Sequence, residues 1–425
     1  MPTDTPPLPP AFNRLVWSNL AAQAAEQVGL AAAPIVAVLA LGAGAGETGL
    51  LQTAQTLPFL LLAIPAGLLA DRMSRPRLMA GAEALRAASL VAILALACFG
   101  GLTWWLLALL GLVGACGTVA YSVAAPALVP ALVPQDALAA ANARIELART
   151  LAFVGGPALA GALAGWTGGT PAFGLAAALS VLAVLLLARI REPARATPRH
   201  RHPLQDIREG IGFAFGHPLL RPVFVTQMIF NAAFFMMHAA YVPHAIRTIG
   251  LSAAGVGATL TTYGVGMVVG ALLATRVVRA LPFGIVVAIG PVAGLAASVV
   301  MALTIWVPSG LLAGLSFFLM GAGPILWVIS TTTLRQTVTP PDLLGRVSAI
   351  NILAYGFRPL GAAGAALVGG AYGADACLVV AAVGFVAQAL VILASPVVRL
   401  ARQPMGAASP VTAPVTAPAP RPGAA

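Results

Sequence analysis

The chain has 425 residues, of which 60% are hydrophobic and only 8% are Asp, Glu, Lys or Arg, whereas soluble domains carry about 25% charged residues. So few charged side chains cannot cover the surface of several soluble domains, and the composition therefore indicates a protein embedded in a membrane. The 23 basic residues are all arginines. Because there is no lysine, this chain contains neither a phosphate-binding GxxxxGK[ST] loop nor a Schiff-base lysine.

Twelve membrane-spanning helices are predicted from the uncharged stretches between successive charged residues. A helix that crosses the ~30 Å hydrocarbon core needs about 20 apolar residues, and a charge within it is costly. We divided the longer stretches at glycine- and proline-rich breaks such as Gly100-Gly101. The predicted helices are 15–41, 48–70, 78–99, 103–127, 138–165, 171–190, 222–246, 251–275, 283–306, 310–333, 344–371 and 376–398.

The arginines gather on one side of this predicted topology. If the N-terminus is cytoplasmic, Arg247 is the one arginine that falls in an external loop, as the positive-inside rule demands. The first twelve residues lack the basic segment of a signal peptide, so we expect the N-terminus to be retained. We therefore expect both termini in the cytoplasm, and we attribute the net charge of +11 to topology and to anionic lipids rather than to nucleic-acid binding.

An internal repeat divides the predicted helices into two sets of six. The segment LLADR at 68–72 recurs as LLATR at 272–276, and PQD at 134–136 recurs as PPD at 340–342. Both pairs occupy equivalent places in the helix count, as in transporters built from two repeated halves. The predicted fold class is an all-α membrane protein of two six-helix bundles related by pseudo-twofold symmetry. Its predicted parts are a cytoplasmic segment 1–14, a bundle 15–190, a cytoplasmic linker 191–218, a bundle 219–398 and a disordered cytoplasmic tail 399–425.

The segment GLLADRMSRPRLM at 67–79 follows the second predicted helix. An acid at a helix end followed by several arginines can form a cytoplasmic latch, and the alternative is an ordinary positive-inside loop. The segment resembles the signature of the major facilitator superfamily, which is similar to GxLaDRxgRR, although Ser74 and Pro76 depart from it. The resemblance implies a cytoplasmic gate motif made of Gly67, Asp71, Arg72, Arg75 and Arg77.

The fifth predicted helix contains GGPALAGALAG at 155–165, whose small residues and kink allow close helix packing. Beyond that structural interpretation, it resembles the antiporter signature of the same superfamily, GPxxGG, at Gly156, Pro157 and Gly161, and this implies efflux. Longer stretches such as IREGIGFAFGHPLLRPVF resemble the enterobactin-exporter and macrolide-efflux branch. Helix 103–127 carries no arginine, whereas many proton-coupled drug antiporters have one there.

Two ionisable residues lie near mid-membrane in the prediction. Glu26 is about 12 residues into the first helix, or roughly 17 Å deep at 1.5 Å per residue. An acid at that depth is costly unless it is protonated, paired or hydrated. We interpret Glu26 as a proton-coupling or cation-binding group, or else as a structurally paired acid. Arg358 is the natural counter-charge of Glu26. Arg358 either faces the cavity in a functional role or belongs to a packing or gating pair.

Five further charged residues have spacings of three and four that permit pairing within a helix. We predict that they form a charge network at the inner gate rather than contact substrate; they are Glu83, Arg86, Arg144, Glu146 and Arg149.

The seventh predicted helix has a polar and aromatic face that suits a cavity wall. The predicted cavity residues are Gln227, Asn231, Phe234 and His238, together with Tyr355 from the eleventh helix. Isolated histidines are more commonly helix contacts than metal ligands, and the three cysteines lie in apolar runs. We therefore expect no metal site, no disulfide and no cofactor.

These features predict a monomeric secondary transporter in a bacterial plasma membrane. We expect it to export a small amphipathic molecule of the drug, macrolide or siderophore type by alternating access, with protons as the coupling ion. The alternative in the same class is an importer or facilitator of a small metabolite. A membrane enzyme is disfavoured because neither HExxH nor GxSxG occurs.

Overall fold

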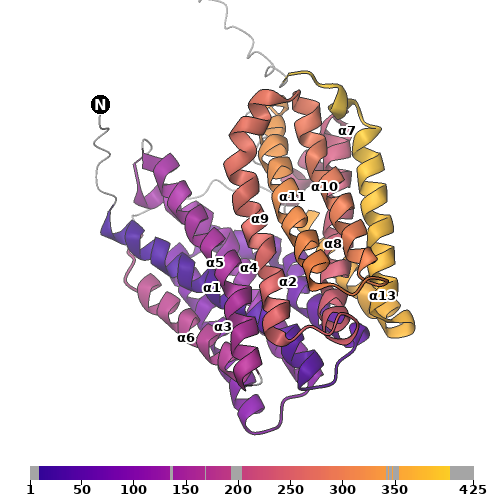
Figure 1. The fold of residues 1–425 in the computed structure, drawn as a ribbon. Helices are drawn as coiled ribbons and strands as arrows, with labels where there is room; N and C mark the ends of the chain where they lie inside the picture. The colour runs from indigo at the N-terminus through magenta and orange to yellow at the C-terminus, as the bar shows by residue number, and fades with distance from the viewer. Residues whose placement is uncertain are drawn as a thin grey trace, which may run out of the picture.

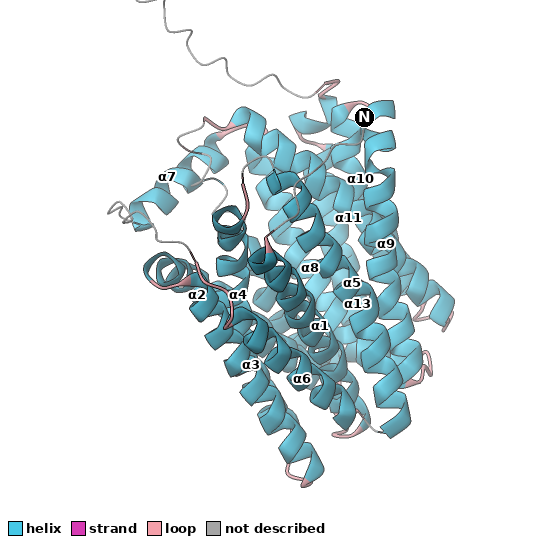
Figure 2. Ribbon diagram, turned by 90° about the vertical axis from the view of Figure 1, so that its left-hand side faces the viewer, coloured by secondary structure: helices cyan, strands magenta, loops and turns pink. Residues whose placement is uncertain are grey.

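The computed structural model describes residues 9–134, 137–167, 169–192, 203–340, 343, 347 and 354–402. These residues form helices and loops without a strand (Figure 2). The first six helices are α1 (Pro10–Leu39), α2 (Ala45–Arg72), α3 (Arg75–Cys98), α4 (Trp104–Leu132), α5 (Leu138–Thr167) and α6 (Thr170–Leu187). The later elements are α7 (Pro203–Gly216), α8 (Leu220–Arg247), α9 (Ala253–Ala280), α10 (Phe283–Leu303), α11 (Gly310–Val338), α13 (Phe357–Leu393) and the 3-10 helix η2 (Pro396–Arg399).

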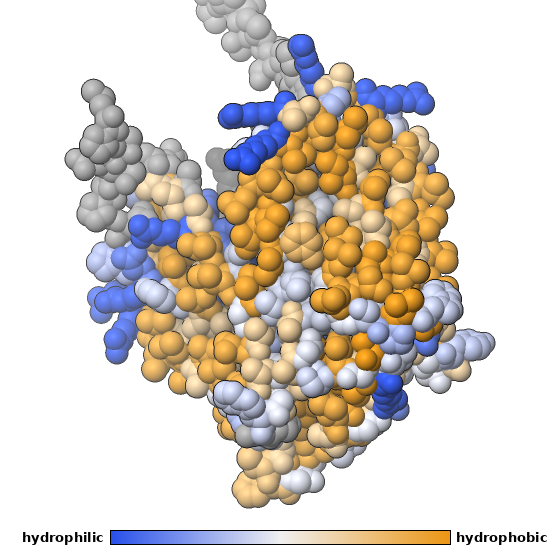
Figure 3. All heavy atoms as spheres, viewed as in Figure 1, coloured by the Kyte–Doolittle hydropathy of each residue, from blue (hydrophilic) through white to orange (hydrophobic). Residues whose placement is uncertain are grey.

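Ten of the described helices are long and apolar enough to cross a membrane, namely α1, α3 to α6, α8 to α11 and α13. Their outward faces expose large apolar side chains, for example Leu311 and Leu367. Figure 3 shows these hydrophobic residues covering one face of the molecule, with hydrophilic residues gathered toward its ends. Such a surface is unfavourable in water and suits contact with lipid. The predicted all-α membrane protein is therefore confirmed.

The predicted helix boundaries differ from the observed ones at several points. The first helix begins at Pro10 rather than at residue 15, and α4 continues to Leu132 through Pro126 and Pro130. A proline is tolerated inside a spanning helix because neighbouring helices can satisfy the freed backbone groups. The linker contains a helix of its own, α7. Residues 1–8 of the N-terminal segment, 193–202 of the linker and 403–425 of the tail lie outside the described residues.

The last long helix, α13, runs for 37 residues but is interrupted at Gly373, where φ is 81° and ψ is 179°. Glycine adopts this left-handed φ at no steric cost. The interruption coincides with the break that we predicted between helices 344–371 and 376–398. Residues 344–346 and 348–353, which begin the first of these predicted helices, lie outside the described residues.

The helices from the first half of the chain gather on one side of the molecule and those from the second half on the other (Figure 1). The two sides approach each other closely where small residues face each other. A Cβ atom added to Gly49 of α2 would lie 2.4 Å from the backbone nitrogen of Ala366 in α13. A Cβ atom on Gly161 of α5 would lie 2.7 Å from the Cα of Gly257 in α9. Glycine is therefore required at both crossings.

These crossings lie toward the end of the molecule that carries the loop between α1 and α2. At that end, the Arg247 guanidinium donates hydrogen bonds to the carbonyl oxygens of Gly42 at 3.0 Å and Ala43 at 2.7 Å. The sides diverge toward the opposite end, where α1 begins (Figure 1). The two sides are thus joined at one end and separated at the other.

Candidate functional site

A central cavity of about 420 Å³ lies between the two sides of the molecule, within the usual range for small-molecule sites. Residues from α1, α2 and α5 line one wall, and residues from α8 to α11 and α13 line the other. All seven residues that we predicted at a central cavity are among the lining residues: Glu26, Gln227, Asn231, Phe234, His238, Tyr355 and Arg358. The cavity also reaches Arg335 in the last turn of α11, so it extends toward the end at which the sides diverge.

Glu26 forms an ion pair with Arg86 of α3. Its Oε2 atom lies 3.7 Å from Arg86 Nη2, while Arg86 Nη1 lies 2.8 Å from Oε1 of Glu83. Arg86 is further held by donating to the Ala22 carbonyl at 3.0 Å and to Thr118 Oγ1 at 2.6 Å. One guanidinium therefore bridges two carboxylates behind the cavity wall.

This cluster corrects the expectation that Arg358 is the counter-charge of Glu26. The guanidinium of Arg86 fills that role because the long Arg86 side chain reaches from α3 to α1, which sequence distance does not reveal. Glu83 and Arg86, two of the five residues predicted in the inner-gate network, are both buried, with 0% of Glu83 and 5% of Arg86 exposed.

The remaining residues of the predicted gate network lie apart from this cluster. Arg149 Nη2 is 2.6 Å from Glu146 Oε1, and the two side chains are 39% and 54% exposed. Arg144 Nη1 donates to Asn13 Oδ1 at 3.5 Å. The five residues therefore form separate groups instead of one network.

Arg358 occupies an aromatic and amide environment. Its Nε donates to Asn231 Oδ1 at 3.2 Å, and its guanidinium carbon lies 4.1 Å from the Tyr355 ring centroid and 5.2 Å from that of Phe235. Stacking of this kind is favourable for a guanidinium. Within the described part of the chain, no acid forms an ion pair with Arg358.

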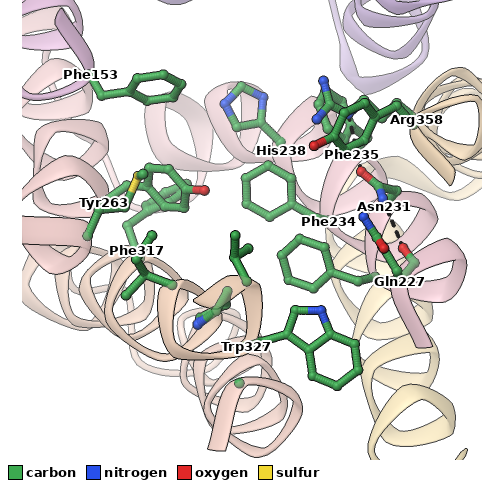
Figure 4. A pocket seen from close by; sticks show the side chains of 18 of the residues that line it. Phe153, Gln227, Asn231, Phe234, Phe235, His238, Tyr263, Phe317, Trp327 and Arg358 are labelled. Carbon is green, nitrogen blue, oxygen red and sulfur yellow. Dashed lines mark hydrogen bonds between the residues drawn. The ribbon is translucent and has the colours of Figure 1, made fainter. Parts of the chain in front are cut away.

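Aromatic rings cover much of the cavity wall on the α8 side. The Phe234 ring lies 5.6 Å from Phe230, 5.8 Å from His238 and 5.8 Å from Tyr263 between centroids. Figure 4 shows Phe234 and His238 beside the open space, with Phe153 and Tyr263 on the side opposite Arg358 and Asn231. The wall can therefore hold flat apolar groups while presenting hydrogen-bonding groups at one side. No group of His, Cys, Asp and Glu in the described residues is arranged to hold a metal ion.

The helix-5 motif lies at contacts between helices. A Cβ atom on Gly156 would lie 2.4 Å from the Cβ of Gln27 in α1, and the Pro157 carbonyl packs against Gly257 of α9. Pro157 also lines the cavity. The motif thus joins α5 to both neighbours beside the cavity.

The motif after α2 lies at the end of the molecule where the sides diverge. Arg75 forms an ion pair with Glu192 at 3.5 Å and donates to the Ala127 carbonyl at 2.6 Å, so it ties the start of α3 to α4 and to the chain after α6. Arg72 and Arg77 are exposed. Gly67 lies in α2 facing Val123 of α4, and the side chain of Asp71 lies outside what the structure describes.

Several cavity residues escaped the sequence analysis, notably Arg335, Tyr263 and Trp327. We interpreted Arg335 as a topological marker, because an arginine at a helix end has the same sequence signature whether it faces lipid headgroups or a cavity mouth. Tyr263 is the one aromatic residue of α9 and Trp327 lies within the aliphatic stretch ILWVI of α11, so neither had a spacing that indicated a cavity wall.

The profile of the Major Facilitator Superfamily matches residues 15–363. An uncharacterised MFS-type transporter, y4rN of Sinorhizobium fredii, is 34% identical over 253 residues, which cover 57% of this chain and 60% of that relative. The multidrug efflux pump Tap of Mycobacterium tuberculosis is 26% identical over 404 residues, which cover 92% of this chain and 94% of the pump.

Solved structures share the fold at low identity. The POT family transporter PepTSo aligns with a TM-score of 0.76 at 11% identity, covering 92% of this chain and 98% of that one. The nucleoside transporter NupG aligns with a TM-score of 0.70 at 14% identity, covering 91% and 99%. The finer placement in the enterobactin-exporter and macrolide-efflux branch stays a prediction. Since the superfamily profile covers most of the chain, the protein belongs to the major facilitator superfamily of membrane transporters.

Proposed function

We propose that this protein exports a small amphipathic molecule by alternating access and exchanges it for protons. The observation that carries the proposal is the position of Glu26, an acid at the wall of a cavity that both sides of the molecule line. An intramembrane acid in such a place is typical of proton relays. The outward direction is supported by the antiporter-like motif of α5 and by the likeness to a protein named as a multidrug efflux pump.

The proposed topology has twelve spans in two six-helix bundles, residues 15–190 and 219–398, joined by a linker at 191–218. The ten candidate spans become twelve when α2 is added and when α13 is counted as two helices that meet at Gly373. An uninterrupted helix of 37 residues would be about 56 Å long, well beyond the ~30 Å that one crossing needs. We place the protein as a monomer in the bacterial plasma membrane, with both termini in the cytoplasm.

In this topology the cavity opens to the cytoplasm, and the crossings at Gly49 and Gly161 close it toward the outside. Rocking of one bundle against the other would separate these crossings and close the inner end. The arginines of the motif after α2 then act at the inner gate. A proton bound at Glu26 removes one of the two negative charges that attract Arg86, which gives the cavity wall two electrostatic states.

The test uses two fluorescent dyes with the same xanthene skeleton, anionic fluorescein and cationic rhodamine 123. Cells that express the protein are expected to retain less of at least one dye than cells without it, and a protonophore is expected to restore retention. In inverted vesicles with an imposed proton gradient, addition of that dye should dissipate the gradient. The variant Glu26→Gln should lose this dye-dependent proton flux.

The matched control is Glu209→Gln, which neutralises an exposed acid on α7 and should leave the flux unchanged. Full dye-dependent proton flux in the Glu26→Gln variant would contradict the role of Glu26. A higher dye content in expressing cells would reverse the direction and favour the importer. Efflux that a protonophore does not affect would contradict proton coupling.

A further inference from the structure

The charges around the cavity are unequal in sign. Among the described residues, four charged ones line it: one acid, Glu26, and three arginines, Arg149, Arg335 and Arg358. The wall therefore carries a formal excess of positive charge. This excess lies beside the aromatic residues of α8 and α9, whose rings can stack on a flat ligand.

Ion pairs with residues outside the cavity wall offset two of these four charges. Glu26 faces Arg86, and Arg149 is held by Glu146 through three hydrogen bonds of 2.6–3.2 Å. Glu146 therefore neutralises Arg149, whereas Glu26 shares the single guanidinium of Arg86 with Glu83, and that cluster keeps one formal negative charge. The two other arginines of the wall outnumber this charge, so the field that a bound ligand meets has a net positive sign.

Arg335 and Arg358 have no such compensation. In the described ranges, neither forms an ion pair with an acid. The Nε of Arg335 is buried without a hydrogen-bond acceptor, and Arg358 has the neutral amide of Asn231 as its acceptor. A guanidinium has five donors in a planar fork that matches carboxylate, sulfonate and phosphate groups. Both residues therefore have donors left for an anion inside the cavity.

We infer that the substrate is an amphipathic organic anion with an aromatic ring system. Arg358 binds its anionic group at the wall formed by α8 and α13, and Arg335 adds attraction from the last turn of α11. The rings lie against Phe234 and Tyr263, across the open space that Figure 4 shows. A lipophilic cation meets two uncompensated guanidinium groups in the same cavity and is disfavoured by their repulsion.

This inference rests on the proposed function and adds the sign of the substrate charge. Export of an anion and entry of a proton both move positive charge inward, so a membrane potential that is negative inside drives both steps. Export of a monovalent cation against one proton moves no net charge. The sign of the substrate therefore determines whether the potential contributes to export.

The experiment measures binding of fluorescein and rhodamine 123 to the purified full-length protein by fluorescence anisotropy. Fluorescein should bind at least about tenfold more tightly than rhodamine 123. Arg358→Gln should weaken fluorescein binding about tenfold or more, Arg335→Gln about threefold to tenfold, and Arg358→Lys less than Arg358→Gln. The control Arg221→Gln, which neutralises an exposed arginine at the start of α8, should leave both affinities unchanged.

Rhodamine 123 binding to the Arg358→Gln variant distinguishes the loss of one contact from misfolding, because a misfolded variant would bind neither dye. A folded variant should bind rhodamine 123 at least as well as the wild type does, because a repelling charge is gone. Equal or tighter wild-type binding of rhodamine 123, or unchanged fluorescein binding in Arg358→Gln, would overturn the inference. If the protein exports rhodamine 123 in exchange for protons but does not bind fluorescein, the anion inference fails while the proposed export function stands.

Discussion

The two sides of the molecule handle charge in opposite ways. On the α1–α6 side, the carboxylates of Glu26 and Glu83 share the guanidinium of Arg86, and the cluster is hydrogen-bonded to α1 and α4. On the other side, Asp375 is the one acid among the described residues from α8 to 402, and it pairs with His244 at 2.7 Å, outside the cavity lining. The cavity wall there carries arginines and aromatic rings instead.

This difference suggests a division of work. A cluster that contains its own counter-charge can gain or lose a proton without a ligand, and it suits ion coupling. A wall with uncompensated guanidinium groups is completed by the ligand, and it suits substrate binding. The comparison predicts that variants in the Glu26 cluster disturb ion coupling, whereas variants in the wall on the other side disturb substrate binding.

The largest effect is expected from Arg86→Leu. Removing the guanidinium leaves the buried carboxylate of Glu83 and the partly buried one of Glu26 without a counter-charge, and breaking a buried pair in this way costs about 3–5 kcal/mol of unfolding free energy. Denaturant unfolding in detergent, followed by tryptophan fluorescence, measures the loss. The double variant Glu83→Leu/Arg86→Leu should recover part of it, because one buried charge is removed as well.

Arg149→Leu is the matched comparison, since its pair with Glu146 also has an i,i+3 spacing but is exposed, at 39% and 54% of the two side chains. Exposed pairs contribute about 0–1 kcal/mol. Equal losses in Arg86→Leu and Arg149→Leu would show that the buried cluster has no special role in stability.

An intermediate effect is expected where the two sides touch. Gly161→Val places a side chain within 2.7 Å of Gly257 Cα, and such overpacking costs about 1–3 kcal/mol. This overpacking destabilises the state in which the α5–α9 crossing is closed. The variant should therefore shift the protein toward the state in which the crossing is open, and dye export should slow. Accessibility of a single cysteine introduced at the cavity wall, probed with a charged maleimide, reports that shift.

Gly155→Val is the control on the same helix, because a Cβ atom there has nothing within 4 Å. If Gly161→Val exports dye as fast as Gly155→Val does, the α5–α9 crossing does not separate during transport.

Hydropathy predicted most of the fold, because the cost of charge in the hydrocarbon core leaves long uncharged stretches in the sequence. The period of an α-helix likewise placed Gln227, Asn231 and His238 on one face, and all three line the cavity. The pairing of Glu26 with Arg86 could not be predicted, because it depends on the direction in which the Arg86 side chain leaves α3 to reach α1. Arg335 could not be separated from the topological arginines for a similar reason: sequence gives its depth in the membrane but not the direction it faces.

The smallest effect is expected from Phe234→Leu, which removes a ring from the aromatic wall but keeps an apolar side chain. Aromatic contacts contribute about 0.5–1.5 kcal/mol beyond the burial of area, so fluorescein should bind about twofold to tenfold more weakly. The stability of the protein should change little, because Phe234 faces the cavity. Phe99→Leu is the control, since Phe99 is 89% exposed and outside the cavity lining. If the two variants bind fluorescein equally well, the wall formed by α8 does not contact the ring system, and substrate binding would have to be assigned to the α1–α6 side instead.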